Sequence, residues 1–545
     1  MYAIDLFCGA GGFSEGILQA GFHIVFSSDR SPYVQKTYMN RHHQLGLIQG
    51  KNTFFELSDI KNLQGQFILD RINELTYFQD KNIEFCTGDI DVIFGGPPCQ
   101  GFSIAGKRDK TDPRNMLFRE YLRVIQEIKP KYIVMENVTG FMNMEINPDF
   151  QSFNGIQYSD NELVSKVVHR ELTEFGYIVL QPRILDASDY GVPQKRQRAI
   201  FLAYREDVAP IAYPEPTTPL PEQKISVIEA LKDISVEGTG EYAKKSILGR
   251  TPHFETGIPI PNHGQPMNVE ESSHSQVIVE RFSLFNQGES ISQLKSRLLK
   301  RKVTGQQVID FDNYPHLFQE SLFNINKQFN LNCLKQISDD NHIENDNKFI
   351  DSLYKRIIKL WNTEIDSTDF IKEIKKPIGK RKVDINTFKT IFSLAKQMFN
   401  NYISHEELKV WFNNTPPEIT DGQIPLYFNL GEATLDWETI LNSVLTNKNT
   451  RTRLDGNLPG PTMVTLPDDF IHPLKNKILN VREMARIQSF DDSFEFLGKR
   501  TTGGDKRKEE VPQFTQVGNA VPPLLAKSIA EVVSEVLKKE KQKRI

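Results

Sequence analysis

The sequence predicts an α/β fold: a doubly wound, mainly parallel sheet in its first part, followed by a second, irregular domain. In residues 1–205, short apolar segments alternate with amphipathic ones, which is the pattern of strands and helices that wrap a parallel sheet. From about residue 206 this alternation stops, and prolines, asparagines and lysines become frequent. After about residue 451 an ordered pattern returns. We therefore expect domains at 1–205 and 206–450, and a return to the first domain at 451–545.

Five apolar segments are the expected strands of the sheet. They read "MYAIDLF", "HIVFSSD", "DVIFGG", "YIVMENV" and "RAIFLAY", and begin at residues 1, 23, 91, 132 and 198. Between the third and the fourth segment, Phe118, Leu122 and Ile125 recur at helical spacing with Val124 beside them, which predicts a packing helix over 118–128.

The second half of the chain contains a predicted linker and two predicted helices. Residues 209–223 hold five prolines, which disfavour helix and central strand alike. The length of the middle region leaves room for an inserted subdomain at about 305–420. Asn480 is a suitable cap for a helix over "VREMARIQSF". In the last helix Leu525, Ile529, Val532 and Val536 form an apolar stripe that we expect to dock on the rest of the protein.

Composition excludes several classes of protein. Hydrophobic residues make up 39% and charged residues 25% of the 545 residues, no apolar run is long enough to cross a membrane, and no signal peptide is visible, so we expect a cytoplasmic protein. We also expect it to be a monomer. The four cysteines, Cys8, Cys86, Cys99 and Cys333, have no metal-ligand spacing, which argues against a zinc site and against a disulfide framework. The net charge of −4 means that any contact with nucleic acid must come from local basic patches.

A glycine-rich turn follows the first expected strand. Gly9, Gly11 and Gly12 let backbone N–H groups approach a ligand at the start of a helix, and Asp29, after the second strand, is placed to bind a ribose. Ser14 stands where the dinucleotide motif requires glycine, which disfavours a nicotinamide cofactor. The pattern therefore indicates a nucleoside-binding βαβ unit.

The segment "GGPPCQGFS" (95–103) places a thiol directly after an expected strand. Two prolines stiffen the backbone before Cys99, and strand ends in open α/β sheets face the ligand crevice. Glu136 ends a second strand at the same edge. In "QKRQR", Gln194, Arg196 and Arg198 alternate, so in an extended segment we expect them to form one ridge facing the crevice.

The ordered set "DLFCGAGG", "GGPPCQGFS", "ENV", "QKRQR", "VREMARIQSF" and "QVGNAVPP" resembles the DNA (cytosine-5)-methyltransferases of bacterial restriction–modification systems. The resemblance covers about residues 1–205 and 451–545. It implies a Rossmann-like methyltransferase sheet, S-adenosyl-L-methionine as cofactor, double-stranded DNA as substrate, and a target recognition domain at 206–450. It also implies a cognate restriction endonuclease that acts on the same site.

The resemblance assigns roles to four catalytic candidates. Cys99 matches the nucleophile that attacks C6 of a cytosine flipped out of the duplex, because the resulting adduct makes C5 reactive toward a methylsulfonium. Glu136 matches the acid that hydrogen-bonds N3 and the exocyclic amine. Arg198 matches the arginine near O2, with Arg196 beside it as a second cation.

The resemblance also outlines a cofactor pocket. The glycine turn (Gly9, Gly11 and Gly12) and the ribose acid Asp29 belong to this pocket. The acid beside the adenine matches either Asp59 or Asp89. Asp59 is preferred, because Asp89 lies close to the catalytic strand. The remaining members of the expected pocket are Phe7, Ile60, Pro98, Leu117, Asn519 and Val521.

Other readings of the sequence stay open at this point. The same scaffold could methylate RNA. A second reading is a catalytically silent DNA-binding relative; the mark of such a protein would be loss of the nucleophile, the acid or the arginines, and all of these are present in this sequence. Three basic runs, at 295–302, 374–382 and 498–508, and the pair Arg451 and Arg453 are either phosphate contacts or solvated side chains.

Overall fold

The computed structural model describes residues 1–98, 116–147, 149–159, 161–343, 346–379, 381–414, 427–430, 433–445, 448, 450–502 and 509–544. The chain divides into two compact units. Unit 1 comprises residues 1–272, 454–474 and 478–545, and unit 2 comprises residues 273–453 and 475–477.

Unit 1 is built on one eight-stranded sheet in the order β3-β2-β1-β4-β5-β8-β6, with β7 paired to β8. The pairs among β1 to β5 are parallel, whereas β8 is antiparallel to β5, β6 and β7. The strands are β1 (Tyr2–Leu6), β2 (His23–Asp29), β3 (Phe54–Leu57), β4 (Val92–Gly95), β5 (Tyr132–Val138), β6 (Tyr177–Val179), β7 (Arg183–Asp186) and β8 (Gln197–Arg205). All five predicted strands are confirmed, whereas β3, β6 and β7 were not predicted.

Helices cover both faces of the sheet, which is the doubly wound α/β arrangement that the sequence predicts. The helices of unit 1 are α1 (Gly12–Gln19), α2 (Pro32–Gln44), α3 (Gly65–Asn73), α4 (Thr76–Gln79), α5 (Leu117–Ile128), α6 (Val164–Glu174), α7 (Val227–Leu231), α8 (Glu241–Leu248), α18 (Val481–Ile487), α20 (Gln513–Asn519) and α21 (Pro523–Arg544). Ile4 and Leu6 of β1 pack with α3, α5 and α6, whereas Ala3 packs with α1 and α21 on the opposite face. Phe118, Leu122, Val124 and Ile125 are buried as expected.

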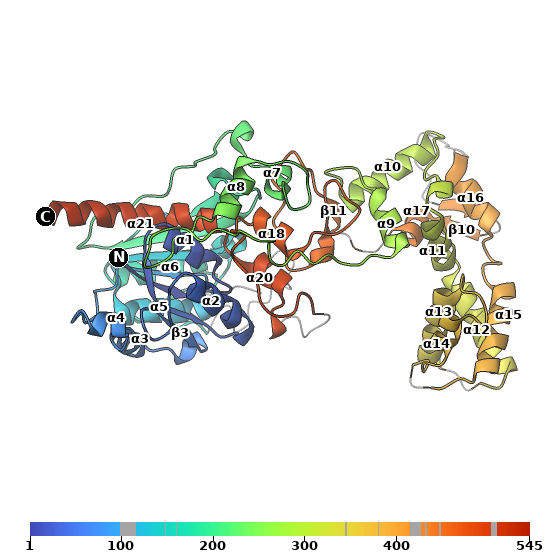
Figure 1. Ribbon diagram of the computed structural model, residues 1–545, viewed down its shortest axis with the longest axis horizontal. Coiled ribbons are helices and arrows are strands. Elements are labelled where there is room, and N and C mark those ends of the chain that lie inside the picture. The colour runs from blue at the N-terminus through green and yellow to red at the C-terminus, as the bar shows by residue number, and fades with distance from the viewer. Residues whose placement is uncertain are drawn as a thin grey trace. The chain divides into compact units, whose positions relative to one another are not determined.

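The C-terminal part returns to the first domain, as the sequence predicts. Asn480 caps α18 by accepting a hydrogen bond from Glu483 N at 2.8 Å. Helix α21 lies along α1, so closely that a Cβ on Gly16 would be 2.4 Å from Ala526 Cβ (Figure 1). The predicted docking stripe needs one correction, because Val533 and Leu537 are buried there with Leu525 and Ile529, whereas Val532 and Val536 are only half-buried.

The boundary between the units differs from the predicted one. Residues 206–272 belong to unit 1 and not to the second domain. The proline-rich segment 209–223 packs on the sheet instead of linking two bodies, because Ile211 and Tyr213 are buried and the Tyr213 hydroxyl donates to Ile200 O at 2.8 Å. The prolines correctly predicted that this segment forms no α-helix or strand; Pro221–Gln223 form a short 3₁₀ helix. A proline-rich composition does not, however, distinguish a linker from a segment that packs on a surface.

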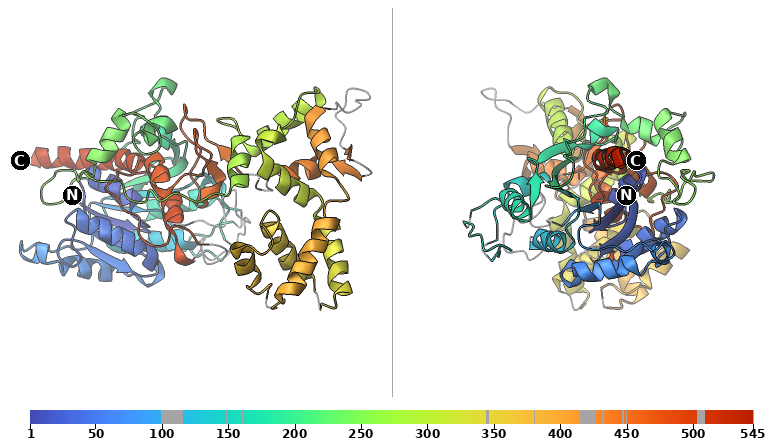
Figure 2. Two further views of the ribbon diagram at one scale, coloured as in Figure 1. Left: turned by 45° about the vertical axis from the view of Figure 1, so that its right-hand side comes forward. Right: turned by 90° about the vertical axis from the view of Figure 1, so that its left-hand side faces the viewer.

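Unit 2 is mostly helical, so the expectation of an irregular domain was wrong. Its elements are α9 (Gln276–Ser283), α10 (Ile291–Val303), α11 (Pro315–Ile325), α12 (Lys327–Asp340), α13 (Asn347–Leu360), α14 (Thr368–Ile374), α15 (Ile385–Met398), α16 (His405–Asn414), β9 (Tyr427–Leu430), β10 (Ala433–Asp436), α17 (Trp437–Val444) and β11 (Thr452–Arg453). Residues between Phe323 and Phe399 share a hydrophobic core of their own, contributed by α11 to α15. Figure 2 shows these helices, yellow to orange, as one group. This core lies inside the range 305–420 that the sequence marks as a possible insertion.

Polar segments such as "QISDDNHIENDNKF" obscured these helices in the sequence. The hydrophobic residues of each helix are spaced for one face only, and that face is buried inside unit 2. None of the described helices is both long enough and apolar enough to span a membrane.

Candidate active site

The carboxyl ends of β4 and β5 lie side by side and carry the first candidate residues. Glu136 is at the end of β5, and its carboxylate is so close to the backbone after β4 that a Cβ on Gly96 would be 3.0 Å from Glu136 Oε2. The neighbouring Asn137 Nδ2 donates to Pro97 O at 3.1 Å and thereby ties the Pro-Pro segment to β5. Pro98 is half-buried. Cys99 lies outside the described residues.

Arg198 reaches Glu136 from the adjacent strand. Since β8 runs antiparallel to β5, its first residues lie beside the last residues of β5, and Arg198 is the register partner of Val138. Arg198 Nε lies 2.6 Å from Glu136 Oε1, and the two side chains are only 12% and 11% exposed. The structure thus joins the predicted acid and one predicted arginine in a largely buried ion pair.

Arg196 does not face the crevice, and the expectation of a cationic ridge was wrong. Its side chain is 2% exposed and donates to two backbone carbonyls, Met463 O at 3.1 Å and Gly518 O at 2.9 Å. Gln194 is also buried and bonds Met463 N and Gln488. The strict alternation of an extended segment does not apply here, because β8 begins only at Gln197.

Burial lowers the pKa of the Arg196 guanidinium well below its usual range, and the nearby charge of Arg198 lowers it further. The predicted second cation is therefore a structural side chain. It joins "QKRQR" to Met463 and to Gly518. Gly518 lies within the segment "QVGNAVPP" (516–523), in which Asn519 and Val521 were predicted to close the cofactor pocket.

The glycine turn has the geometry expected of a ligand cradle. Phe7, Gly9 and Gly11 have positive φ angles of 58°, 55° and 100°, and Phe7 is the unusual member because side chains with a Cβ rarely adopt this conformation. Asp29 Oδ2 accepts from Gly9 N at 3.2 Å, and Asp29 Oδ1 accepts from Ser31 N at 2.8 Å. Burial raises the pKa of Asp29, although these backbone hydrogen bonds oppose the rise.

Gly12 brings the turn against the C-terminal segment. A Cβ at this position would lie 2.5 Å from Val521 O, so no larger residue fits without a shift. Val521 is buried and Asn519 is exposed at the end of α20. The predicted turn and the predicted closing segment are therefore neighbours, and this close approach fits a cofactor cradle of backbone N–H groups.

The two candidates for the adenine acid lie at opposite ends of the sheet strands. Asp59 follows β3, at the carboxyl edge where parallel strands present ligands, and it caps a short 3₁₀ helix by accepting from Lys61 N at 3.1 Å. Asp89 precedes β4, at the amino edge, is exposed, and accepts from Cys86 N at 2.7 Å. This geometry favours Asp59. Ile60 and Leu117, the other apolar members, are buried.

Several basic residues of unit 2 have partners within the protein. Arg297 forms a two-pronged pair with Glu289, and the buried Lys302 donates to Trp411 O and lies over the Trp411 ring. Arg453 is 5% exposed and donates to Phe282 O at 2.7 Å. These side chains hold helices and segments together, which is neither of the two alternatives that the sequence left open for them, phosphate contact or solvated side chain.

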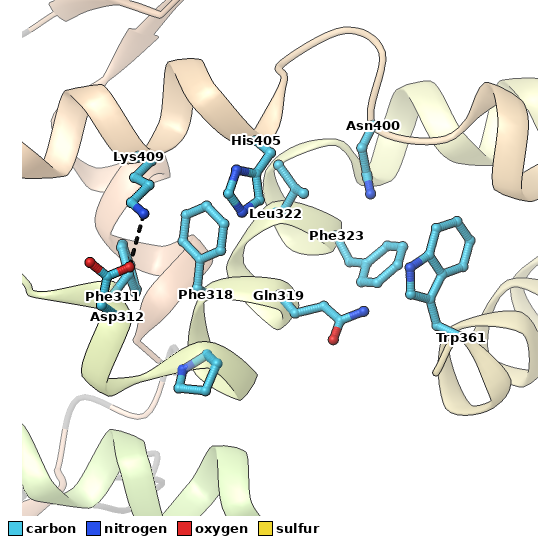
Figure 3. Close-up of a pocket in the computed structure, with 11 residues that line it drawn as sticks. Phe311, Asp312, Phe318, Gln319, Leu322, Phe323, Trp361, Asn400, His405 and Lys409 are labelled. Atoms are coloured by element: carbon cyan, nitrogen blue, oxygen red, sulfur yellow. Dashed lines mark hydrogen bonds and ion pairs between the residues drawn. The ribbon is translucent and has the colours of Figure 1, made fainter. Parts of the chain in front are cut away.

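A pocket of about 390 Å³ lies within unit 2 and contains none of the predicted site residues. Figure 3 shows Phe318, Phe323 and Trp361 along it, with the ion pair of Lys409 and Asp312, 2.9 Å apart, at one end. The described residues contain no group of three or more His, Cys, Asp or Glu side chains arranged to hold a metal.

Comparison with known proteins identifies relatives along the whole chain. Type II methyltransferase M.DdeI of Desulfomicrobium norvegicum is 25% identical over 98% of this chain and 88% of its own length. Type II methyltransferase M.AgeI of Thalassovita gelatinovora is 24% identical over 98% and 99% of the two chains. Type II methyltransferase M1.HphI of Haemophilus parahaemolyticus is 36% identical, over 39% of this chain and 48% of its own length.

A solved structure and a family model complete the comparison. A prophage-encoded candidate DNA modification methyltransferase from E. coli has the same fold at a TM-score of 0.50, with 17% identity over 99% of both chains. The model of the C-5 cytosine-specific DNA methylases matches residues 1–317 and 309–535. The protein therefore belongs to the C-5 cytosine-specific DNA methylase family and is a DNA (cytosine-5)-methyltransferase.

Proposed function

We propose that the protein methylates cytosine in a specific double-stranded DNA sequence through a covalent adduct between Cys99 and C6 of the base. Attack by the thiolate at C6 pushes the ring electrons toward C5, which becomes an enamine carbon and a nucleophile. S-adenosyl-L-methionine, when bound, supplies the methyl group from its sulfonium. Loss of the C5 proton and expulsion of the Cys99 sulfur then restore the aromatic ring.

The pair of Glu136 and Arg198 is the observation that carries this proposal. Its polar atoms stand beside Gly96 and the Pro-Pro segment that leads directly to Cys99. A carboxyl group there can hydrogen-bond N3 and the exocyclic amine of a flipped cytosine, and a guanidinium can stabilise the charge that develops on O2. Neither a catalytically inactive DNA-binding protein nor a dehydrogenase requires an acid and an arginine paired at the ends of two adjacent strands.

The cofactor would be held at the same carboxyl edge of the sheet. The turn from Phe7 to Gly12 would offer backbone N–H groups, and Asp29, at the end of β2, would bind the ribose hydroxyls. Asp59 and Ile60 would line the adenine, with Pro98, Leu117, Asn519 and Val521 completing the pocket. The close approach of Gly12 and Val521 supports this arrangement.

Residues 206–450, and in particular the helical unit 2, are proposed to select the target sequence. A base inside a duplex is inaccessible to Cys99, so the protein has to extrude it and offset a cost of a few kcal/mol with contacts elsewhere. We further propose that the enzyme acts as a monomer on duplex DNA and protects that DNA from a restriction endonuclease of the same specificity. DNA is favoured over RNA because the family model that matches residues 1–317 and 309–535 is that of the C-5 cytosine-specific DNA methylases.

The experiment that tests the mechanism is adduct trapping. The target site is first mapped from 5-methylcytosine in DNA of cells that express the protein. A duplex with 5-fluorocytosine at that site is then incubated with the enzyme and the cofactor, because fluorine at C5 cannot leave as a proton and the adduct persists. We expect a denaturation-resistant protein–DNA species with the wild type.

Two variants make the outcome decisive. Cys99→Ser should form no trapped species and yet bind the cofactor, whereas Cys86→Ser, which alters an exposed thiol, should trap like the wild type. Trapping by Cys99→Ser would overturn the assignment of the nucleophile. Absence of 5-methylcytosine in the expressing cells, with methyl transfer to RNA instead, would overturn the assignment of the substrate.

A further inference from the structure

A buried chain of hydrogen bonds lies beneath the glycine turn. Asp5 of β1 accepts from Ser14 Oγ, in the first turn of α1, at 2.5 Å. Ser14 Oγ lies 3.2 Å from the hydroxyl of Tyr38 on α2, which in turn lies 2.5 Å from Ser27 Oγ on β2. All four residues are at most 1% exposed. The chain joins four elements, and no role in the proposed reaction accounts for it.

One atom of this chain is not satisfied. Asp5 Oδ1 is buried and has no hydrogen-bond partner among the described residues. An ionised carboxylate accepts several hydrogen bonds in water, so a buried carboxylate oxygen that accepts none costs free energy. The chain also reaches the turn itself, since a Cβ on Gly11 would lie 3.3 Å from the Tyr38 ring.

The groups around Asp5 do not neutralise its charge. Burial raises the pKa of Asp5 to about 7, and the neighbouring Asp29 on β2 adds to the rise, whereas the hydrogen bond from Ser14 opposes it. Burial also raises the pKa values of Cys8, Tyr38 and Tyr121 on α5 well above their ordinary values, so these groups stay neutral. Glu15 on α1 faces away and pairs with Arg41 at 2.9 Å.

We propose that Asp5 is a specificity-determining residue for the cofactor: its incompletely paired carboxylate, under the turn from Phe7 to Gly12, favours a cationic ligand over a neutral one. The inference rests on the proposed cofactor, S-adenosyl-L-methionine, whose sulfonium is positive, whereas its demethylated product, S-adenosyl-L-homocysteine, has no charge on sulfur. A nearby cation lowers the free energy of the ionised carboxylate and releases its proton. The enzyme then prefers substrate cofactor over product once Asp5 is ionised.

The test measures the affinity of the full-length protein for both ligands by calorimetry at pH about 6 and about 8. If the cation lowers the pKa of Asp5 by about one unit, the ratio of the two dissociation constants shifts toward S-adenosyl-L-methionine about fivefold between these pH values. The titration of the amino group that both ligands carry largely cancels in the ratio. In Asp5→Asn, which keeps the shape and loses the charge, the ratio should be smaller and independent of pH.

Two further readouts guard against a variant that only perturbs the fold. In Ser14→Ala, Asp5 loses the hydrogen bond that lowers its pKa, so the midpoint of the pH dependence should move upward. Without ligand, the wild type should lose stability relative to Asp5→Asn as the pH rises from about 4 to about 7, because the unfolded chain releases this proton at lower pH than the folded one.

The outcomes separate the two proposals. A wild type that binds neither ligand contradicts the proposed cofactor. The other negative result is a wild type that binds both ligands, with a ratio of dissociation constants that does not change with pH and is the same in Asp5→Asn. This result contradicts only the role of Asp5 and leaves the cofactor assignment intact.

Discussion

Arg198 Nε contacts Glu136 Oε1 at 2.6 Å, from two antiparallel strands that meet at the carboxyl edge of an otherwise parallel sheet. Each side chain therefore holds the other in place, and under the proposed mechanism the pair is already formed before a base binds. In a site of low exposure, such fixed charges stabilise a transition state without having to reorganise.

Replacing either partner of this pair should affect methyl transfer and not cofactor binding. We expect Glu136→Gln and Arg198→Met to lower the rate constant of transfer by roughly 10²- to 10³-fold, which is typical for removal of one preorganised group. Single-turnover assays with labelled cofactor, together with binding titrations, measure the two effects. Arg205→Ala, at the other end of β8, is the matched control and should retain activity. A variant of the pair that keeps full activity would contradict the assignment.

Asp29→Ala should weaken cofactor binding by about 1–3 kcal/mol, because the ribose would lose its acceptor and Gly9 N would lose its partner in the turn. The measurement is a dissociation constant for S-adenosyl-L-homocysteine. The melting temperature of the variant without ligand shows whether the effect is confined to binding. An unchanged affinity in a folded variant would place the ribose acid elsewhere.

The choice between Asp59 and Asp89 can be tested in the same way. Asp59→Ala should reduce cofactor affinity several-fold, since Asp59 lies at the carboxyl edge of the sheet and caps the turn that contains Ile60. Asp89→Ala is the matched change at the amino edge and should have no effect on affinity. The opposite result would reverse the assignment.

Arg196→Met should act on stability rather than on chemistry. The variant leaves Met463 O and Gly518 O without their buried donor, at a cost of about 1–3 kcal/mol for each unsatisfied carbonyl. Removal of a desolvated cation offsets part of this cost. Denaturant unfolding should show the loss, while folded enzyme should retain methyl transfer within a few-fold. A large catalytic defect without loss of stability would restore the sequence-based role of Arg196.

Salt dependence tests the basic run on α10. Lys300 and Arg301 are exposed. The other three basic residues are less available, because Lys295 pairs with Glu438, Arg297 pairs with Glu289 and Lys302 is buried. Lys300 and Arg301 can therefore contact phosphates most readily. The double change to alanine should weaken binding to all duplexes alike and reduce the slope of log affinity against log salt by up to about two units. Arg297→Gln is the control on the same helix. An unaltered slope in the double variant would assign this face of α10 to solvent.

The doubly wound sheet and most residues of the candidate site could be predicted from the amino-acid sequence alone. Strands β1, β2, β4, β5 and β8 are continuous apolar runs because they are buried on both faces, and this makes them visible without any tertiary information. The glycine turn, Asp29 and Glu136 could be placed because the ends of parallel strands share one edge. Asn480 was recognisable as a cap because capping is a local interaction.

The environments of two similar residues could be told apart only once the chain was folded. Arg196 and Arg198 are two positions apart, yet one bonds backbone carbonyls from distant segments and the other bonds Glu136, and no local pattern encodes those partners. The same reason explains why residues 209–223 were predicted to be a linker, although apolar side chains of this segment pack on the sheet. It also explains why the helices of unit 2 were not predicted, since their buried apolar faces are interrupted in sequence by polar residues. Burial depends on contacts between residues far apart in sequence, and the unsatisfied carboxylate of Asp5 became visible only once those contacts were in place.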